Sequence, residues 1–249
     1  MRVFKFGGTS LGSATRMLDV ARLVASEGGP VVVVASAMSG VTNLLVEAAH
    51  AVADGDRDRA SVIVAELDGK HNEALATLLR AGAGVPGFEG GHELVALRDI
   101  MGDLWEVLAA TVQIGELTPR VRDRVLSAGE KLSVRLVVVA MRAVGLDAVA
   151  LDADEFLETD GTFGDATPLS GVADRTLHAA LSPHLEAGRV PVVTGFCGRA
   201  PDGATTTLGR GGSDLTATVI AGALDAAEVT LWSDVDGVYS ADPRIVPEA

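Results

Sequence analysis

Short runs of β-branched residues alternate with longer helical segments along most of this chain, and glycine-rich loops join each strand to the helix that follows. Val3–Phe6 and Val31–Ser36 have the composition of buried strands. Each run is followed by glycine and then by apolar residues at helical spacing. A layered sheet with helices on both faces requires this alternation. The pattern therefore predicts an α/β fold, a three-layer αβα sandwich with a mainly parallel central sheet.

The remaining elements continue this pattern with one long interruption. Further strands are predicted at Asp147–Leu151, Val190–Thr194 and Glu228–Trp232, and a helix is predicted at Val172–Ala187. The stretch from about 54 to 143 has few strand signals and repeated helical periodicity, which predicts a helical insertion or lid. Within it, Thr118 and Pro119 form a cap and a first-turn proline before a helix. The polar, glycine-broken stretch 158–170 predicts a mobile loop.

Charge and composition exclude several classes of partner. Twenty basic and 34 acidic residues give a formal charge of −14, which repels nucleic acid and anionic membranes. The apolar runs are too short to span a bilayer, and Met1–Phe6 has no secretory hydrophobic region. The single cysteine, Cys197, excludes an intrachain disulfide and is expected to be a loop residue without a nucleophilic role. We therefore expect a cytoplasmic protein with no nucleic-acid or membrane partner.

The segment Thr205–Asp214 combines three threonines, three glycines, an arginine and an aspartate. It follows the predicted strand Val190–Thr194 and precedes a helix predicted to open at Leu215–Ala221. Glycines at a helix N-terminus leave free N–H groups, which together with the helix dipole favour an anion. A tight turn without chemistry is the alternative, because glycine also permits a positive φ for purely structural reasons.

Two further loops have the same character. Lys5 precedes Gly7-Gly8-Thr9-Ser10 directly after the first strand, which places a cation beside two glycines and two hydroxyls. Its order differs from the common P-loop, where the lysine follows the glycines. The loop 36–43 closes the second strand. A solvated lysine in the first loop and an N-cap at Thr42 or Asn43 in the second are the alternatives. In an open α/β sheet ligands bind at this edge, so the three loops predict one site.

Five blocks in order now resemble a known family, the catalytic domain of aspartate kinase within the amino acid kinase family. They are Lys5–Ser10, Ser36–Asn43, Gly129–Ser133, Thr205–Asp214 and Trp232–Tyr239 with Asp242-Pro243-Arg244. The resemblance runs from residue 3 to the end of the chain and implies the amino acid kinase, or carbamate kinase-like, fold. It implies one catalytic domain over 1–249. Residues 1–195, with the insertion at about 54–143, would form mainly the amino-acid lobe, and 196–249 would begin the nucleotide lobe.

The resemblance implies transfer of the γ-phosphoryl group of MgATP to the side-chain carboxylate of L-aspartate. The product would be 4-phospho-L-aspartate, at the entry to lysine, threonine and methionine biosynthesis. An aspartate carboxylate is ionised at pH 7 and needs no general base, so the site must chiefly supply positive charge and alignment. The expected cofactors are therefore ATP and Mg²⁺, with no cluster of protein metal ligands.

The same resemblance implies a role for each matching residue. Lys5 and Asp214 would be catalytic, and Asp214 has an N-cap as its alternative role. Arg210 would bind the α-carboxylate of aspartate with its bidentate fork, and Glu130 would bind the ammonium unless it is an exposed helix charge. Further substrate contacts would come from Ser36, Thr42 and Ser213. Phosphate and nucleotide contacts would come from Lys5, Gly7, Gly8, Thr9, Gly211, Gly212, Ser233, Asp234, Tyr239 and Arg244.

The last of these blocks also fits a purely structural interpretation. Asp236-Gly237 and Asp242-Pro243 are ordinary turn pairs, and Tyr239 would then only pack. The family continues to a further lysine-containing segment and usually to ACT regulatory domains, neither of which is expected before Ala249. Two alternatives follow: a non-catalytic module that binds aspartate or nucleotide, and a related kinase with another acid substrate. A homo-oligomer, or a partner segment that supplies the missing C-terminal part, is a possible assembly.

Overall fold

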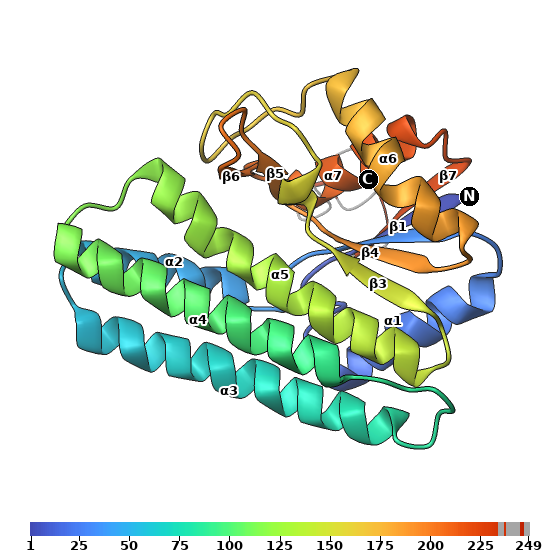
Figure 1. Ribbon diagram of the computed structural model, residues 1–249. Coiled ribbons are helices and arrows are strands. Elements are labelled where there is room, and N and C mark those ends of the chain that lie inside the picture. Colours follow the sequence, from blue (N-terminus) through green and yellow to red (C-terminus); the bar gives the residue numbers. More distant parts are fainter. Residues whose placement is uncertain (234–236, 238–244, 247–249) are drawn as a thin grey trace.

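A five-stranded parallel sheet forms the centre of the protein, with the strand order β3-β4-β2-β1-β7 (Figure 1). The computed structural model describes residues 1–233, 237 and 245–246. The strands are β1 (Arg2–Phe6), β2 (Val31–Ala35), β3 (Ala148–Leu151), β4 (Val190–Thr194) and β7 (Glu228–Trp232). Since β1 pairs in parallel with both β2 and β7, the first strand is an interior strand of the sheet and lies beside the last strand of the described residues.

Helices cover both faces of this sheet. On one face lie α1 (Ala14–Glu27) and α5 (Pro119–Ala143), and on the other lie α6 (Val172–Glu186) and α7 (Gly212–Ala223), as Figure 1 shows. Strand residues alternate between the two layers of core. Phe4 and Val33 pack with the α1 and α5 side, whereas Val34 packs with the α6 and α7 side. The predicted three-layer αβα sandwich with a parallel sheet is confirmed.

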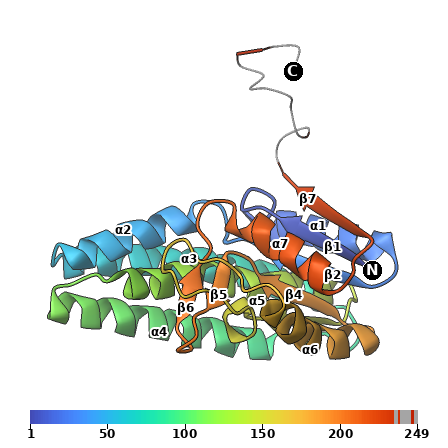
Figure 2. The same cartoon turned by 90° about the horizontal axis from the view of Figure 1, so that it is seen from above.

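Residues 54–143 consist mainly of three long helices. They are α3 (Arg57–Gly82), α4 (Gly91–Ile114) and α5, which pack with α2 (Val41–Ala53) as one helical layer. Seen from two directions, these helices extend past the carboxyl ends of the strands (Figures 1 and 2). The predicted start of α5 is confirmed: the Thr118 side chain accepts from Val121 N at 3.2 Å, and Pro119 is the first helical residue. One helix, α5, thus joins the sheet to the helical layer.

A small antiparallel hairpin separates β4 from α7. Its strands are β5 (Cys197–Arg199) and β6 (Thr205–Thr207). The prediction of a direct junction between the strand Val190–Thr194 and the helix is therefore wrong, and the three threonines belong to a strand. The reason is local: three-residue strands are too short to produce a periodic signal. Cys197 is correspondingly a buried strand residue, and burial raises the pKa of its thiol, which does not favour a nucleophilic role.

Most other boundaries agree with the pattern. The strands Val190–Thr194 and Glu228–Trp232 are confirmed, whereas the helix expected to open at Leu215 begins at Gly212. The stretch 158–170 contains only two isolated bridges, and a 3₁₀ turn at Ala153–Glu155 precedes it. Over the described residues, every helix is too short or too polar to cross a bilayer.

Candidate active site

Lys5 lies at the carboxyl end of β1 and forms the centre of the site. Its Nζ atom is 2.8 Å from Asp214 Oδ1, and the two side chains are 15% and 46% exposed, respectively. The ion pair joins the first strand to the first turn of α7. A solvated lysine is therefore the wrong interpretation. The N-cap alternative for Asp214 is also wrong, because Gly211 occupies the cap position. The two residues expected to be catalytic thus lie in contact.

The glycine loop after β1 approaches the neighbouring backbone closely. A Cβ atom on Gly8 would lie 3.0 Å from the carbonyl oxygen of Ala37, and one on Gly7 would lie 3.6 Å from Lys5 Nζ. The loop ends where Leu11 N donates to the carbonyl oxygens of Gly7 and Gly8, both at 3.2 Å. Glycine at these positions lets the chain pass between Lys5 and the adjacent loop, which leaves backbone groups free to face a ligand.

The loop after β2 lies beside the first loop because β1 and β2 are neighbouring strands. Ser36 Oγ donates to Ser213 Oγ at 3.0 Å, which ties this loop to the first turn of α7. Helix α2 begins at Val41 with Gly40 as its cap, at a φ of 81°. The alternative interpretation of this loop, an N-cap at Thr42 or Asn43, is therefore wrong, and a left-handed glycine occupies the cap position.

Helix α7 points its N-terminus at the same place. Gly211 has a φ of 74° and Gly212 is the first helical residue, so the predicted glycine-capped helix start is confirmed. The end of β4 packs directly on this turn: a Cβ on Gly195 would lie 2.6 Å from the Ser213 side chain. The amide groups of the first turn therefore face the strand ends, where the helix dipole favours an anion.

Glu130 enters the site from α5. Its side chain is buried, and Oε1 accepts a hydrogen bond from Ala37 N at 3.2 Å, whereas Oε2 has no hydrogen-bond partner among the described residues. Burial raises the pKa of this carboxyl to about 8. An exposed helix charge is therefore the wrong interpretation. A buried carboxylate with a free oxygen is costly unless a cationic group of a ligand satisfies it.

Two cavities meet at Lys5. One, of about 290 Å³, is lined by Glu130, Ser213, Asp214 and the glycines that flank Arg210. The other, of about 420 Å³, is lined by the glycine loop after β1, the loop after β2 and Ser233 at the end of β7. Three residues line both cavities: Lys5, Ser36 and Thr42. Two ligands bound in these cavities would both be in reach of the Lys5 ammonium group.

Arg210 is next in sequence to residues that line the smaller cavity and does not itself line it. Its side chain is exposed, and it makes no hydrogen bond or ion pair with the part of the chain that is described. Gly209 and Gly211 line the cavity on either side of it. A free guanidinium at this position is available for an anionic group of a ligand. Three other predicted site residues, Asp234, Tyr239 and Arg244, lie outside the described residues.

Phe196 also lines the smaller cavity and was missed by the sequence interpretation. Its φ of 67° is in the left-handed region, which is strained for an aromatic residue, and its N–H donates to Thr216 Oγ1 at 3.2 Å. Helix α7 thus contributes to holding this conformation. A phenylalanine after a glycine carries no sequence signal of such a conformation.

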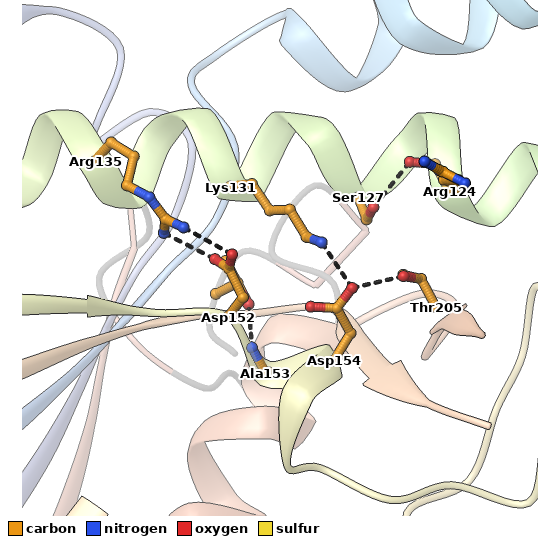
Figure 3. A network of polar contacts seen from close by, with 9 residues as sticks. Arg124, Ser127, Lys131, Arg135, Asp152, Ala153, Asp154 and Thr205 are labelled. Atoms are coloured by element: carbon orange, nitrogen blue, oxygen red, sulfur yellow. Dashed lines mark hydrogen bonds and ion pairs between the residues drawn. The ribbon is translucent and has the colours of Figure 1, made fainter. Parts of the chain in front are cut away.

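A larger cavity, of about 480 Å³, lies between α4, α5 and the β5–β6 hairpin. Figure 3 shows the charged network beside it: Lys131 Nζ donates to Asp154 Oδ2 at 2.7 Å, and Arg135 binds both oxygens of Asp152 at 2.7 and 2.8 Å. The Thr205 hydroxyl donates to the same oxygen of Asp154 at 2.5 Å. These cations are already paired, and the residues of the two glycine loops are absent from the lining. We assign this network a structural role.

Metal binding by the protein alone has no support in the described part of the chain, where no three His, Cys, Asp or Glu side chains gather around one point. Magnesium commonly keeps several waters and takes one or two carboxylates together with substrate phosphates. Asp214, which is 46% exposed beside Lys5, is a carboxylate of this kind. The residues therefore fit a metal that arrives with a nucleotide.

Known proteins with similar sequences show the family to which this chain belongs. The model of the amino acid kinase family matches residues 1–249, and the chain belongs to this family. Among its relatives, the chain is similar to lysine-sensitive aspartokinase 3 of Escherichia coli K12, with 35% identity over 99% of this chain and 52% of the relative. It is also 38% identical to chloroplastic aspartokinase 2 of Arabidopsis thaliana, over 99% of this chain and 44% of the relative.

A solved structure shows the same likeness in three dimensions. Aspartokinase III of E. coli in complex with aspartate and ADP has a TM-score of 0.83 and 31% identity, over 98% of this chain and 52% of that chain. The chain thus spans about half the length of the relatives it matches. Its fold and its family are those that the sequence blocks indicate.

Proposed function

We propose that this chain transfers the γ-phosphoryl group of MgATP to the side-chain carboxylate of L-aspartate, giving 4-phospho-L-aspartate and ADP. The observation that carries the proposal is the place of Lys5, which lines both cavities and contacts Asp214. The relatives named aspartokinase, one of them solved with aspartate and ADP, support the choice of substrates. The product is the starting point for lysine, threonine and methionine.

The reaction asks little acid or base chemistry of the protein. A carboxylate oxygen of aspartate forms a bond to the γ-phosphorus while the bond from that phosphorus to the β,γ-bridging oxygen breaks. The carboxylate is ionised at pH 7, so no proton is removed. Lys5 neutralises the charge on the transferring group, and the ion pair with Asp214 holds its ammonium between the two cavities.

In this proposal the smaller cavity holds aspartate. The ionised form of Glu130 binds the substrate ammonium with the oxygen that has no partner among the described residues, and Arg210 binds the α-carboxylate from the turn between Gly209 and Gly211. Further contacts come from Ser36, Thr42 and Ser213, all of which line this cavity. One buried anion in the lining and one exposed cation next in sequence to lining residues match the two charged groups of an α-amino acid.

The cavity of about 420 Å³ between the loops after β1 and β2 holds the nucleotide phosphates in this proposal. Gly7, Gly8 and Thr9 line it and supply donors, with Ser233 at its edge. The N-terminus of α7 supports the same charge through Gly211 and Gly212. Mg²⁺ bound with ATP would supply additional positive charge, and Asp214 would help to hold it through water. We also assign Asp234, Tyr239 and Arg244 to the nucleotide, on the family resemblance alone.

The domain organisation belongs to the same proposal. Residues 1–195 form mainly the amino-acid lobe and 196–249 begin the nucleotide lobe, and each of the two cavities takes lining residues from both parts. We place the activity in the cytoplasm, which suits a chain whose single cysteine is an unpaired thiol. Association with a second copy or with a further C-terminal segment is part of the proposal for the whole protein.

The test is an assay of acyl phosphate formation. The purified protein is incubated with MgATP and aspartate, and the acyl phosphate is captured with hydroxylamine as a coloured hydroxamate. Aspartate-dependent hydroxamate is expected, and none is expected with glutamate or N-acetylglutamate. Signal with glutamate alone would assign another acid substrate. Calorimetric binding of aspartate without any hydroxamate would establish a binding module and overturn the enzymatic proposal.

A further inference from the structure

A buried carboxylate outside the two cavities holds the segment that leads to Arg210. Asp123 lies on α5 and is completely buried. Its Oδ2 accepts from Gly164 N and from Thr207 N, each at 2.8 Å, and its Oδ1 accepts from Thr207 Oγ1 at 2.8 Å. Three donors thus satisfy one carboxylate, in place of a cation. Since Glu130 lies seven residues further along α5, about two turns, the same helix face serves both residues.

Asp123 joins two segments that are far apart in sequence. Thr207 is the last residue of β6, and Gly164 lies in the stretch 158–170. The two segments also bond directly, because Ala166 N donates to the Thr207 carbonyl oxygen at 2.9 Å. Immediately beyond β6, a Cβ on Gly209 would lie 2.4 Å from Asp165 Oδ1. The stretch 158–170 is therefore packed against the turn that carries Arg210. Asp123 is hydrogen-bonded to this stretch at Gly164 and to the strand before the turn at Thr207.

The turn itself has little intrinsic order. Gly209 and Gly211, at φ values of 70° and 74°, flank Arg210, and glycine is the residue with the greatest backbone freedom. On the far side the turn is held by α7, where Ser213 bonds to Ser36 at 3.0 Å. On the near side the hydrogen bonds of Thr207 to Asp123 fix the chain just before the turn begins.

We propose that Asp123 is a positioning residue that orders the Leu208–Gly212 turn and thereby places Arg210 for the substrate carboxylate. The proposal rests on the proposed function for its substrate and on the contacts above for its mechanism. The held turn lines the smaller of the two cavities and not the one assigned to the nucleotide. Gly211 and Gly212, which we also assign to the phosphates, belong to the start of α7 and are held from that side, so the effect falls on the amino-acid substrate.

The other end of β6 offers a matched control. Thr205 begins the strand, and its hydroxyl donates to Asp154 at 2.5 Å within the network of Figure 3. Thr205→Val and Thr207→Val remove equivalent hydroxyls from the two ends of one three-residue strand. Thr207→Val loosens the end next to the turn, whereas Thr205→Val loosens the end next to the hairpin.

The principal variant is Asp123→Asn, which keeps the shape but removes the charge and replaces the oxygen that accepts from the Thr207 hydroxyl with an NH₂ group. We expect the KM for aspartate to rise about tenfold, the effect of one charge-assisted hydrogen bond, with the KM for MgATP and kcat within about twofold. Thr207→Val should do the same more weakly, and Thr205→Val should leave both KM values unchanged. A fall in kcat with unchanged KM values would mean only a smaller folded fraction and would overturn the proposal. Thr207→Val gives the same decision if Asp123→Asn fails to fold.

Hydrogen exchange separates this proposal from the proposed function. Amides of Leu208–Gly212 should exchange about tenfold faster in Asp123→Asn, with those of β1 and β2 unchanged. Unchanged exchange at Leu208–Gly212 would overturn the positioning role even if the enzyme is active. If the unsubstituted protein neither binds nor phosphorylates aspartate, the proposed function fails, and the exchange rates still decide whether Asp123 orders the turn.

Discussion

Glu130 should make the protein less stable and more able to bind aspartate as the pH rises. Its carboxyl is buried with one oxygen unpartnered among the described residues, and burial raises its pKa to about 8. Glu130→Gln is the informative perturbation. The amide has the same size, and its oxygen can still accept from Ala37 N, but it does not ionise. The variant therefore separates the charge of Glu130 from its packing.

The loss of stability with rising pH follows from how many protons the folded and the unfolded protein bind. An unfolded glutamate ionises near pH 4.5, whereas the folded group ionises near pH 8. Between these values the folded state holds a proton that the unfolded state has lost. The contribution of the protonated Glu130 carboxyl to the free energy of unfolding is therefore fully present below pH 4.5 and is lost as the pH rises through about 8. The full difference corresponds to roughly 5 kcal/mol, a large part of the 5–15 kcal/mol by which domains are stable.

Urea denaturation of the two proteins across pH measures this difference. Relative to the unsubstituted protein, Glu130→Gln should gain about 3 kcal/mol in free energy of unfolding between pH 5.5 and pH 8. Other titrating groups contribute equally to both proteins and cancel in the difference. A free-energy difference that is constant across this pH range would show that Glu130 is ionised in the folded protein, and the reasoning from burial would be refuted.

Aspartate binding should follow the opposite trend. Because only the ionised carboxylate attracts the substrate ammonium, affinity should increase about tenfold for each pH unit up to about 8 and then level off. Binding near pH 7 should also release a proton, which calorimetry in buffers of different ionisation enthalpy detects. Glu130→Gln should bind aspartate weakly at every pH. Equal pH dependence in both proteins would exclude Glu130 as the ammonium site.

Three further substitutions and one control test the other parts of the site. Lys5→Met should lower kcat by about 10²–10³ with little change in aspartate affinity measured by calorimetry, and lost affinity with retained kcat would contradict its assigned role. Arg210→Lys should raise the KM for aspartate about tenfold in the hydroxamate assay because a lysine cannot form a bidentate pair, and an unchanged KM would exclude the contact. Gly8→Ala should raise the KM for MgATP, since the added Cβ would lie 3.0 Å from the Ala37 carbonyl oxygen. The matched Gly12→Ala, with nothing nearer than 3.4 Å, should have a smaller effect, and equal effects would refute the argument from close approach.

Sequence pattern was a good guide to the elements and loops that local periodicity encodes. The strand Glu228–Trp232 and the capped start of α5 at Thr118 are as predicted. The two loops after β1 and β2 also lie side by side, because parallel neighbours present their carboxyl ends at one edge. By contrast, the β5–β6 hairpin was missed, since three-residue strands leave no periodic signal.

By itself the sequence determined the layered α/β architecture, the family and the glycine loops that approach Lys5, because period, residue size and residue order are all local properties. Only the tertiary structure decided that Glu130 is buried with a free oxygen, that Phe196 has a left-handed conformation, and that Asp123 holds the end of β6. Each of these depends on segments far apart in sequence meeting in the folded chain. The burial of Asp123, the pKa of Glu130 and the strain at Phe196 are set by these tertiary contacts, which no local sequence pattern encodes.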